Sequence, residues 1–365
     1  TWENNLGFFA KSKNAVRCDY VSGTRRRLTV VEQAAKEEGG FAKLLNFVTS
    51  LLPIVIIGGL LYAGFFVKGT TDIKKVEPKA VERRDNFYSI IAPTDQVAWA
   101  VGTGGKIIRS EDGGKSWTRQ QTSTIENLQG IAAWDAQTAV AVGNRGLAFH
   151  TADGGKTWKP SSVPKSDNPN KLLRVSIFDG VAWAVGEFGG FFRSDDKGAT
   201  FTRVLPEKDS ALNAVFFSGK NGILVGEFGS MLKSADGGAT WTDSPVENKV
   251  SLMSIAFSTE TEGVAVGLAG TLMTTADGGA TWTLVPPLTR EHLFSVIWDT
   301  NRWVVVGDKG VMLTAEAGAQ DWKLGKVFEG DIAWRTQIVK GGSRYYVAGA
   351  NLGILEDGKL TIVGR

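Results

Sequence analysis

One eight-residue pattern returns along this chain at a nearly fixed interval, and it limits the possible folds more than any other feature. Each copy ends in an aromatic residue, and the copies run over Ser110–Trp117, Thr151–Trp158, Ser194–Phe201, Ser234–Trp241, Thr275–Trp282 and, in degenerate form, Ala315–Trp322. The closing aromatic residues lie 41, 43, 40, 41 and 40 residues apart. A repeat of this length predicts supersecondary units that stack on one another and share a core.

The residue types of the pattern predict a hairpin turn. A Ser or Thr and, two places on, an Asp can accept hydrogen bonds from nearby backbone N–H groups, and the following Gly adopts a conformation that other residues resist. The aspartates hold the same place in successive units, which favours a structural role over a catalytic one. They are Asp112, Asp153, Asp196, Asp236 and Asp277.

Four short strands are predicted around each copy. An apolar first strand such as Leu128–Ala133 is suited to burial near an axis. The second strand ends in Val-Gly or Ala-Gly, a further Gly three residues on closes a turn into the third strand, and the aspartate turn leads to the fourth. First strands can be counted seven times, the last at Ile332–Val339. The sequence therefore predicts an all-β, seven-bladed β-propeller over residues 87–365.

Composition and charge exclude several kinds of site. The chain contains one cysteine, Cys18, so no intrachain disulfide can form, and with only two histidines, His150 and His292, we expect neither a metal nor a cofactor. Residues 1–86 carry 14 Lys or Arg and 9 acidic residues, which leaves 27 and 29 for the rest of the chain. A domain with that balance lacks the basic surface of a nucleic-acid-binding protein, so no nucleic acid is expected as a partner.

An uncharged apolar stretch, Leu44–Val67, lies N-terminal to the repeats. At about 1.5 Å per residue in a helix, its 24 residues would reach roughly 36 Å, enough to cross a bilayer. It is too long for the apolar core of a cleaved signal, so we expect a single uncleaved transmembrane helix over residues 44–67. Residues 1–43 are then a tail, and the charged residues 68–86 form a stalk that leads to the propeller.

The charges beside this helix do not decide its orientation. The 20 residues before it carry five Lys or Arg, and the 20 after it carry six. A long folded domain is translocated largely regardless of its charge. We therefore expect a single-pass protein of the inner (plasma) membrane, with its N-terminus in the cytoplasm and its propeller in the periplasm or otherwise outside the cytoplasm.

A group of small residues within the apolar stretch predicts a helix-packing face. It consists of Gly58, Gly59, Ala63 and Gly64. Gly59 and Ala63 have the four-residue spacing that lets a second helix approach closely. Glycine is common in membrane helices in general, so a chance grouping is the alternative.

The repeat resembles the Asp-box (BNR) propellers, and among these it is most similar to the photosystem II stability/assembly factor family. The resemblance rests on Ser/Thr-x-Asp-Gly-Gly-x-Thr-Trp, with Val-Gly-x-x-Gly eight residues before it, in five well-formed copies within Phe87–Arg365. It implies a non-enzymatic, chaperone-like propeller outside the cytoplasm. The uncleaved anchor and the N-terminal tail depart from the photosynthetic members, and the arginine-rich binding patch of that family cannot be assigned here residue by residue.

Sialidases are the enzymes of the Asp-box group and supply the catalytic alternative. Their chemistry uses an arginine triad, a Tyr/Glu nucleophile pair and an Asp acid/base. The Arg-Ile-Pro motif of that family is absent from the sequence, and the tyrosines of the repeat region, Tyr88, Tyr345 and Tyr346, have no recognisable nucleophile context. A glycan-binding or sialidase-like protein is therefore the weaker interpretation.

These features predict a non-enzymatic, membrane-anchored accessory or assembly subunit of an inner-membrane protein complex. Propellers present two broad faces without internal motion, which suits a scaffold. An RND-type transporter of lipids or hydrophobic compounds is the suspected partner, because propellers of the family that this chain resembles are often encoded beside such transporters. Photosystem II assembly is the first alternative, and glycan binding or hydrolysis is the second.

The turns between second and third strands predict where a partner binds, because they lie on the face opposite the aspartate turns. In the third and fourth units an aromatic residue stands at the tip of this turn, where it is hard to bury, so two rings and their neighbouring carboxylates would form an exposed patch. The predicted partner-binding residues are Glu187, Phe188, Glu227, Phe228, Arg145 and Lys309. The alternatives are that both rings fold inward over the channel, or that one duplication copied an indifferent pair.

Overall fold

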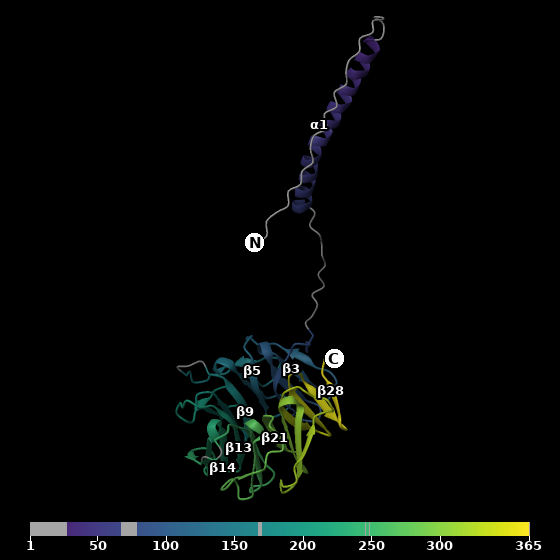
Figure 1. Cartoon of the computed structure of the whole chain (residues 1–365). Helices are drawn as coiled ribbons and strands as arrows, with labels where there is room; N and C mark the ends of the chain where they lie inside the picture. The colour runs from purple at the N-terminus through teal and green to yellow at the C-terminus, as the bar shows by residue number, and fades with distance from the viewer. Residues whose placement is uncertain (1–27, 67–78, 167–169, 245, 248, 365) are drawn as a thin grey trace, which may run out of the picture. The chain divides into compact units, whose positions relative to one another are not determined.

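The computed structural model describes residues 28–66, 79–166, 170–244, 246–247 and 249–364 of the 365-residue chain. The chain divides into two compact units, Thr1–Glu77 and Pro78–Arg365. The first contains a helix and the second contains the strands (Figure 1). The second unit begins before the first repeat, because Ala80 and Val81 pack against its core instead of belonging to a solvated stalk.

The helix of the first unit, α1, runs over Leu28–Phe66. Its segment Ala42–Phe66 is long and apolar enough to cross a membrane, and 0% of that apolar window is buried inside the protein. Large side chains such as Leu60 and Phe65 are 68% and 76% exposed, which suits a helix surrounded by lipid. The helix begins inside the expected tail, so the apolar segment is the second part of a longer helix. Val67, the last residue of the expected span, lies outside the described residues.

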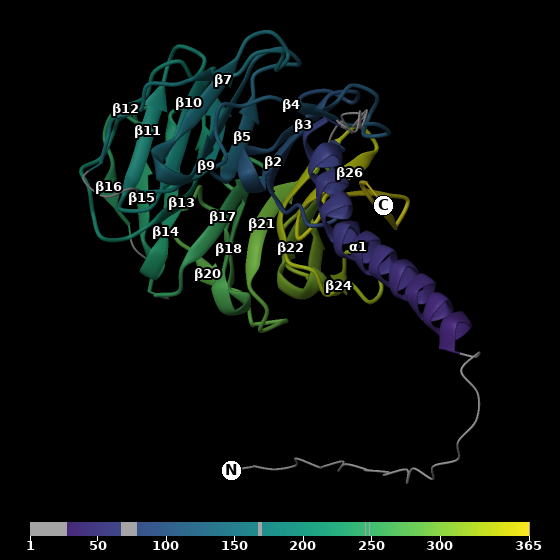
Figure 2. The ribbon, with the colours of Figure 1, turned by 90° about the horizontal axis from the view of Figure 1, so that it is seen from above.

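The second unit is a β-propeller of seven four-stranded antiparallel sheets, which confirms the predicted fold class. Figure 2 shows strands of successive blades side by side. Blade one consists of β1 (Phe87–Ile91), β2 (Ala98–Gly102), β3 (Ile107–Ser110) and β4 (Thr118–Gln120). Blade two consists of β5 (Leu128–Ala133), β6 (Ala139–Gly143), β7 (Ala148–Thr151) and β8 (Lys159–Pro160). Blade three consists of β9 (Leu172–Phe178), β10 (Val181–Gly186), β11 (Gly190–Ser194) and β12 (Thr202–Arg203).

The remaining blades repeat the same order. Blade four consists of β13 (Leu212–Ser218), β14 (Asn221–Gly226), β15 (Met231–Ser234) and β16 (Thr242–Asp243). Blade five consists of β17 (Leu252–Phe257), β18 (Gly263–Gly267), β19 (Leu272–Thr275) and β20 (Thr283–Leu284). Blade six consists of β21 (Leu293–Trp298), β22 (Arg302–Gly307), β23 (Val311–Glu316) and β24 (Lys323–Lys326). Blade seven consists of β25 (Arg335–Gly341), β26 (Arg344–Gly349), β27 (Gly353–Glu356) and β28 (Lys359–Ile362).

Antiparallel pairing gives the propeller two distinct faces. The turns between second and third strands and the links between blades lie on one face, which we call the Gly-x-x-Gly face. The aspartate turns between third and fourth strands lie on the other, the Asp-box face. In five blades the Gly-x-x-Gly turn is short, and its central residue has a left-handed backbone conformation: η1 (Thr103–Gly105), η2 (Asn144–Gly146), η3 (Glu227–Gly229), η4 (Leu268–Gly270) and η5 (Asp308–Gly310).

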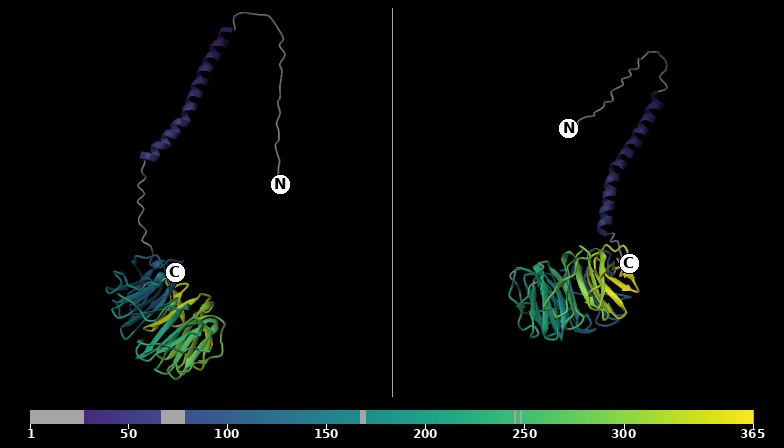
Figure 3. Two further views of the ribbon diagram at one scale, coloured as in Figure 1. Left: turned by 90° about the vertical axis from the view of Figure 1, so that its left-hand side faces the viewer. Right: turned by 60° about the horizontal axis from the view of Figure 1, so that its bottom comes forward.

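The ring closes by side-chain packing between blades seven and one. Phe87 and Ile90 of blade one and Tyr346 of blade seven are fully buried in one apolar cluster, and Val81 packs against it. No strand forms in the described residues 79–84, so the N-terminal segment adds no fifth strand here. Figure 3 shows the last blade, in yellow, beside the first, in blue.

The aromatic residues that close the repeats fill the seams between blades. Trp158, Phe201 and Trp322 are 7%, 4% and 8% exposed. Trp117, Trp241 and Trp282 are half-buried. Each of the six packs against the neighbouring blade that comes before its own in the ring. For Trp117 of blade one, that neighbour is blade seven.

Blade seven departs from the expected strand boundaries. Its inner strand was predicted from Ile332, but β25 begins at Arg335 and Ile332 is 83% exposed in the preceding link. The link ends in a buried ion pair, because Arg335 Nε lies 3.0 Å from Asp331 Oδ2. The sequence does not show whether an apolar residue is buried in a strand or exposed in a link. Ile332 was therefore wrongly assigned to the strand.

Candidate interaction surfaces

Each well-formed Asp box fixes its own turn. In blade two the hydroxyl of Thr151 accepts the N–H of Gly155 at 2.9 Å and donates to Asp153 Oδ1 at 2.8 Å. Asp153 Oδ1 also accepts the N–H of Thr157 at 3.0 Å. The Thr157 hydroxyl donates to Asp153 Oδ2 at 2.6 Å. This bond above all, with those from the Thr157 N–H and the Thr151 hydroxyl, lowers the pKa of Asp153 to about 2. The equivalent bonds lower the pKa to about 2 in Asp112, Asp236 and Asp277.

Each Asp box also covers the blade before it. A Cβ atom added to Gly155 would meet the side chain of Gln120 in blade one, and one added to Gly238 would lie 2.4 Å from the Trp183 ring in blade three. Trp158 donates its indole N–H to Gln120 Oε1 at 2.9 Å. The box and its aromatic residue therefore seal the seam with the preceding blade.

Blade seven has a shortened turn in place of the box. The strand register places Leu360 where blade one has Trp117, and Leu355 where it has Ser110. Four residues separate the two leucines, against six between Ser110 and Trp117. The seam with blade six is therefore left open.

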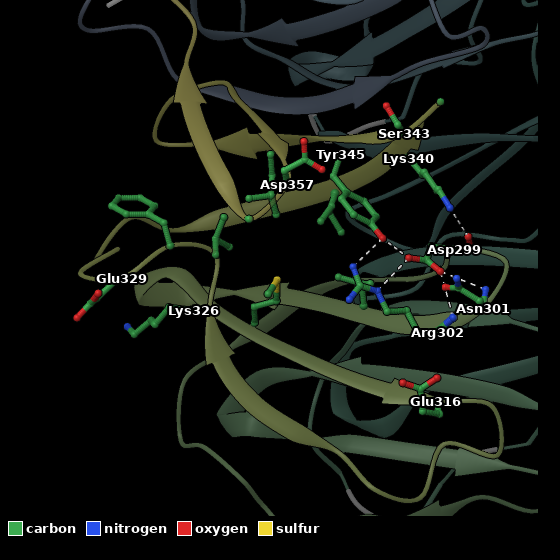
Figure 4. A pocket seen from close by; sticks show the side chains of 18 residues that line it. Asp299, Asn301, Arg302, Glu316, Lys326, Glu329, Lys340, Ser343, Tyr345 and Asp357 are labelled. Atoms are coloured by element: carbon green, nitrogen blue, oxygen red, sulfur yellow. Dashed lines mark hydrogen bonds and ion pairs between the residues drawn. The ribbon is translucent and has the colours of Figure 1, made fainter.

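A hollow of about 880 Å³ occupies this open seam (Figure 4). We call it the seam groove, and its lining includes Asp299, Arg302, Val304, Met312, Tyr345 and Leu355. Val304 precedes the closing glycine of its strand by three residues, as Trp183 does in blade three. In blade three that position is covered by the next box, whereas Val304 faces the hollow.

One wall of the seam groove carries a hydrogen-bonded cluster, labelled in Figure 4. Tyr345 donates its hydroxyl to Asp299 Oδ2, and Arg302 donates Nε to the same oxygen at 3.2 Å. A second Arg302 nitrogen lies 3.1 Å from the Tyr345 hydroxyl. Burial raises the pKa of Tyr345, and the Asp299 contact adds to the rise. Burial works against ionisation of Asp299, but the Tyr345 hydroxyl and two backbone N–H groups outweigh it and the pKa is lowered.

This cluster braces the wall and is poorly suited to proton transfer. The Asp299 side chain is 1% exposed, and Oδ1 accepts the backbone N–H groups of Asn301 and Arg302 while Oδ2 is held by Tyr345. A general acid or base needs a free oxygen within reach of substrate. Among the described residues, no group of three or more His, Cys, Asp or Glu could hold a metal ion.

The two predicted aromatic turns differ from each other. Phe188 and Phe228 both adopt left-handed backbone conformations, with φ of 53° and 56°. Phe228 is 69% exposed, whereas Phe188 is half-buried. The link after β12 accounts for the difference, because the N–H of Lys208 donates to the Phe188 carbonyl at 3.3 Å and brings that link against the turn. Of the two predicted rings, only Phe228 is therefore exposed on the Gly-x-x-Gly face.

The neighbouring glutamates are held within their own blades. Glu187 Oε2 accepts the N–H of Lys171 at 2.9 Å, and Glu227 Oε2 accepts the N–H of Ala211 at 2.8 Å. Each carboxylate therefore fastens the turn to the start of the inner strand. Sequence reasoning placed them beside the rings but did not foresee that their oxygens would be occupied.

The two predicted cations of this face are exposed and weakly paired. Lys309 Nζ lies 3.0 Å from Glu291, and Arg145 Nε lies 4.0 Å from Glu126. Exposed ion pairs contribute little to stability. Both cations therefore remain accessible to a partner.

Most of the exposed large apolar side chains of the propeller lie on the Gly-x-x-Gly face. Among the described residues of the propeller there are six, and four of them lie in turns or interblade links of this face: Ile125, Phe228, Phe328 and Ile332. The other two, Leu284 and Leu324, lie on outer strands. Sequence reasoning named only Phe228. Apolar residues in the links would have indicated the others.

The inner strands enclose a narrow channel. A hollow of about 110 Å³ lies where they begin, near the Gly-x-x-Gly face, and Arg174 of blade three is the one charged residue in its lining. Burial lowers the pKa of Arg174 to about 10. Arg174 was not among the residues predicted from the sequence, although a cation in an apolar inner strand is a visible signal.

The small residues of α1 present an open surface. A Cβ atom added at Gly58, Gly59 or Gly64 would meet no atom within 4 Å. Ala63 is exposed as well. A second helix could approach here, and a packing role stays a prediction.

Comparison with known proteins places these features in a family context. The model of the family described as Photosynthesis system II assembly factor YCF48 matches residues 122–209 and 243–328. The sequence has no match among curated proteins.

Several solved structures share the fold. A structure of YCF48 bound to D1 peptide has a TM-score of 0.61 at 16% identity, over 76% of this chain and 93% of that one. YCF48 from Cyanidioschyzon merolae has a TM-score of 0.63 at 16% identity, over 76% and 98%. A GH74 xyloglucanase from Xanthomonas campestris has a TM-score of 0.60 at 16% identity, over 76% of this chain and 53% of that one.

Identities this low show a shared fold and nothing about activity. The family match is more specific, because it covers three of the five well-formed Asp boxes, Thr151–Trp158, Ser194–Phe201 and Thr275–Trp282. The chain is therefore an Asp-box, seven-bladed β-propeller that resembles the photosystem II assembly factor family and carries one N-terminal helix long and apolar enough to cross a membrane.

Proposed function

We propose that this protein is a non-enzymatic binding propeller, anchored in a membrane, that holds a segment of an integral membrane protein while a multi-subunit complex is assembled. The family match supports an assembly role. One structure of YCF48, a protein of similar fold, contains a D1 peptide, so a propeller of this shape can bind a peptide segment.

The observation that carries the proposal is Phe228, a large aromatic side chain that is 69% exposed at the tip of a turn on the Gly-x-x-Gly face. Phe228 lines a hollow of about 360 Å³, and Lys208 and Met231 line it as well. An aromatic anchor with charged neighbours is typical of a protein interface.

The proposed topology follows from the apolar segment of α1. The N-terminus would lie in the cytoplasm, α1 would cross the inner membrane, and the propeller would lie outside the cytoplasm. The open surface at Gly58, Gly59, Ala63 and Gly64 would then pack against a helix of the partner complex.

The partner's identity is best approached through the family match, which favours a photosystem-type assembly client over other complexes. An RND-type transporter has no support among the comparisons. The likeness to a xyloglucanase extends only to the fold, so it gives no support to a glycosidase activity.

Co-purification of the full chain from native membranes tests this function. We expect an integral membrane protein among the partners identified by mass spectrometry, and we expect Gly59→Ile with Ala63→Ile to weaken its recovery without preventing membrane insertion. A matched change outside the small-residue face, Leu60→Ile, should leave recovery unchanged. Recovery of soluble proteins only, or none, would contradict the proposal.

A further inference from the structure

The inner strands are tied together by a belt of side-chain hydrogen bonds. In four blades the third residue of the inner strand accepts the N–H of the fourth residue in the next blade. The bonds join Ser89 Oγ to Ile131 N at 3.1 Å, Ser254 Oγ to Val296 N at 3.3 Å, Ser295 Oγ to Ile338 N at 3.4 Å, and Gln337 Oε1 to Ile90 N at 2.9 Å. The position therefore serves, in these blades, to bridge neighbouring strands.

Blade three places a cation in the belt. The register with the second strand puts Arg174 at this position, and Gly130 and Ala214 in the blades on either side. An arginine has no acceptor for the N–H of the next blade. It reaches across the channel instead, with one terminal nitrogen 3.4 Å from the Phe294 carbonyl oxygen of blade six. Its other N–H groups have no hydrogen-bond partner in the part of the chain that the structure describes.

The hollow around Arg174 is built from donors and apolar groups. Its lining contains no acidic residue. Gln337 contributes an amide whose oxygen already accepts from Ser89 and Ile90, so its NH₂ group is free to donate. Met253 and Phe294 supply an apolar side. A cation in a confined space without an anion is costly, so the site as it stands is incomplete.

We propose that this hollow binds a carboxylate group, held by the guanidinium of Arg174 and the amide of Gln337. A planar guanidinium matches the two oxygens of a carboxylate, and one positive charge suits a singly charged group. The apolar side would contact the methyl or methylene that carries the carboxylate. This inference is independent of the proposed function, because a free small carboxylate, an acidic side chain and a chain terminus all present the same group.

The test uses the full chain in nanodiscs and acetate as the probe, observed by saturation transfer to the acetate methyl protons. We expect a signal with the unaltered chain, a signal at least tenfold weaker with Arg174→Ser, and an intermediate one with Arg174→Lys. Acetamide should give none. Arg193→Ser is the matched control, since Arg193 lies in the same blade but pairs with Asp195 on the surface at 2.6 Å, and it should leave the signal unchanged.

The serine variant is chosen because blades one, five and six carry serine at this position. Its hydroxyl can accept the N–H of Val215 and extend the belt, so its Tm should equal or exceed that of the unaltered chain. A lower Tm with an undiminished acetate signal would make Arg174 a brace to blade six and overturn the proposal. Displacement of acetate by an equal concentration of chloride would also overturn it, because the site would then select charge alone.

The same assay separates the possible sources of the carboxylate. N-acetyl-aspartate amide represents an acidic side chain, and a tetraglycine peptide with a free C-terminus represents a chain end, with its amidated form as control. Tighter binding of either one than of acetate identifies its source and supports the site. Equal binding of the free and amidated peptides, with no effect of Arg174→Ser on either, would contradict it.

Discussion

Gly114 of blade one packs directly on Tyr346 of blade seven. A Cβ atom at position 114 would lie 2.9 Å from Tyr346 Cε1 and 2.5 Å from Ile354 Cδ1. Gly114 also has a φ of 90°, in the region that favours glycine. The first Asp box can therefore approach the last blade only because this residue has no side chain, and that contact helps to close the ring.

Gly114→Ala should destabilise the propeller by about 2–5 kcal/mol. The left-handed backbone accounts for about 1–2 kcal/mol, and forcing a methyl group into the closed seam accounts for a further ~1–3 kcal/mol. Gly237→Ala is the matched control, because Gly237 has a φ of 74° and open space around it, so it should show the backbone cost alone. Thermal and urea unfolding measure both. If both variants lose the same free energy of unfolding, the packing between blades one and seven accommodates the added methyl group without strain, and this account of the contact is contradicted.

Asp153→Ala should destabilise the second Asp box by about 1 kcal/mol, at the lower end of the range for a lost hydrogen-bond acceptor because the carboxylate is partly solvated. The pKa of Asp153 is about 2 in the folded chain against an ordinary value of 3.8. A depressed pKa adds stability that is present above pH 3.8 and is lost as the pH falls toward 2. The variant should therefore lose Tm less steeply than the unaltered chain over that interval. If the Tm of the variant and the Tm of the unaltered chain fall equally steeply over that pH interval, this account of the box is contradicted.

Grafting an Asp box onto blade seven should stabilise the propeller by about 1–3 kcal/mol, the range for burying one large apolar side chain. The graft replaces Leu355–Leu360 by the sequence of Thr275–Trp282 and should fill the seam groove. The same graft ending in Ala in place of Trp is the control and should give little of the gain. Calorimetry and hydrogen exchange in β22 and β26 report the result. A full-length graft that lowers the Tm would show that the groove is not an unfilled box site.

Phe228→Gly should lose the partner and leave the propeller at least as stable. Glycine relieves the left-handed strain at this turn, worth about 1–2 kcal/mol, and the greater freedom of the unfolded chain offsets about 0.4–1 kcal/mol of that gain. Ala269→Gly is the matched control, because Ala269 occupies the equivalent place in blade five with a φ of 53° and carries no aromatic ring. Both variants should keep or raise the Tm, and only the first should lose binding. Loss of binding in both would point to turn flexibility and not to the ring.

The blade count could be predicted from the sequence because each unit carries its own seal. A box and its aromatic residue have to cover the preceding blade, so their spacing reports the size of the unit even where one copy, Ala315–Trp322, is worn. Blade seven could be counted without a box because its second strand still ends in Ala-Gly at Gly349. Its shortened turn was visible as well, but the hollow that it leaves depends on what blade six presents across the seam.

The candidate sites were less predictable because they depend on residues from different blades. Phe188 and Phe228 have the same local sequence, and only the link after β12 makes one half-buried and the other exposed. In the sequence, Arg174 is a single charged residue in a predicted strand. Its contact with Phe294, 120 residues further along the chain, forms only when the blades close into a ring. Local patterns record turns and strands, whereas these contacts arise from ring closure.

Site-specific photocrosslinking from position 228 in living cells tests the central claim most directly. A benzoylphenylalanine in place of Phe228 keeps an aromatic ring at the exposed tip, and the same group at Leu284, an exposed residue on the outer strand of blade five, is the control. We expect position 228 to crosslink to an integral membrane protein and position 284 to give no such product. Crosslinks from position 228 that are absent, or that match those from position 284, would contradict the account of this protein as a membrane-anchored binding propeller.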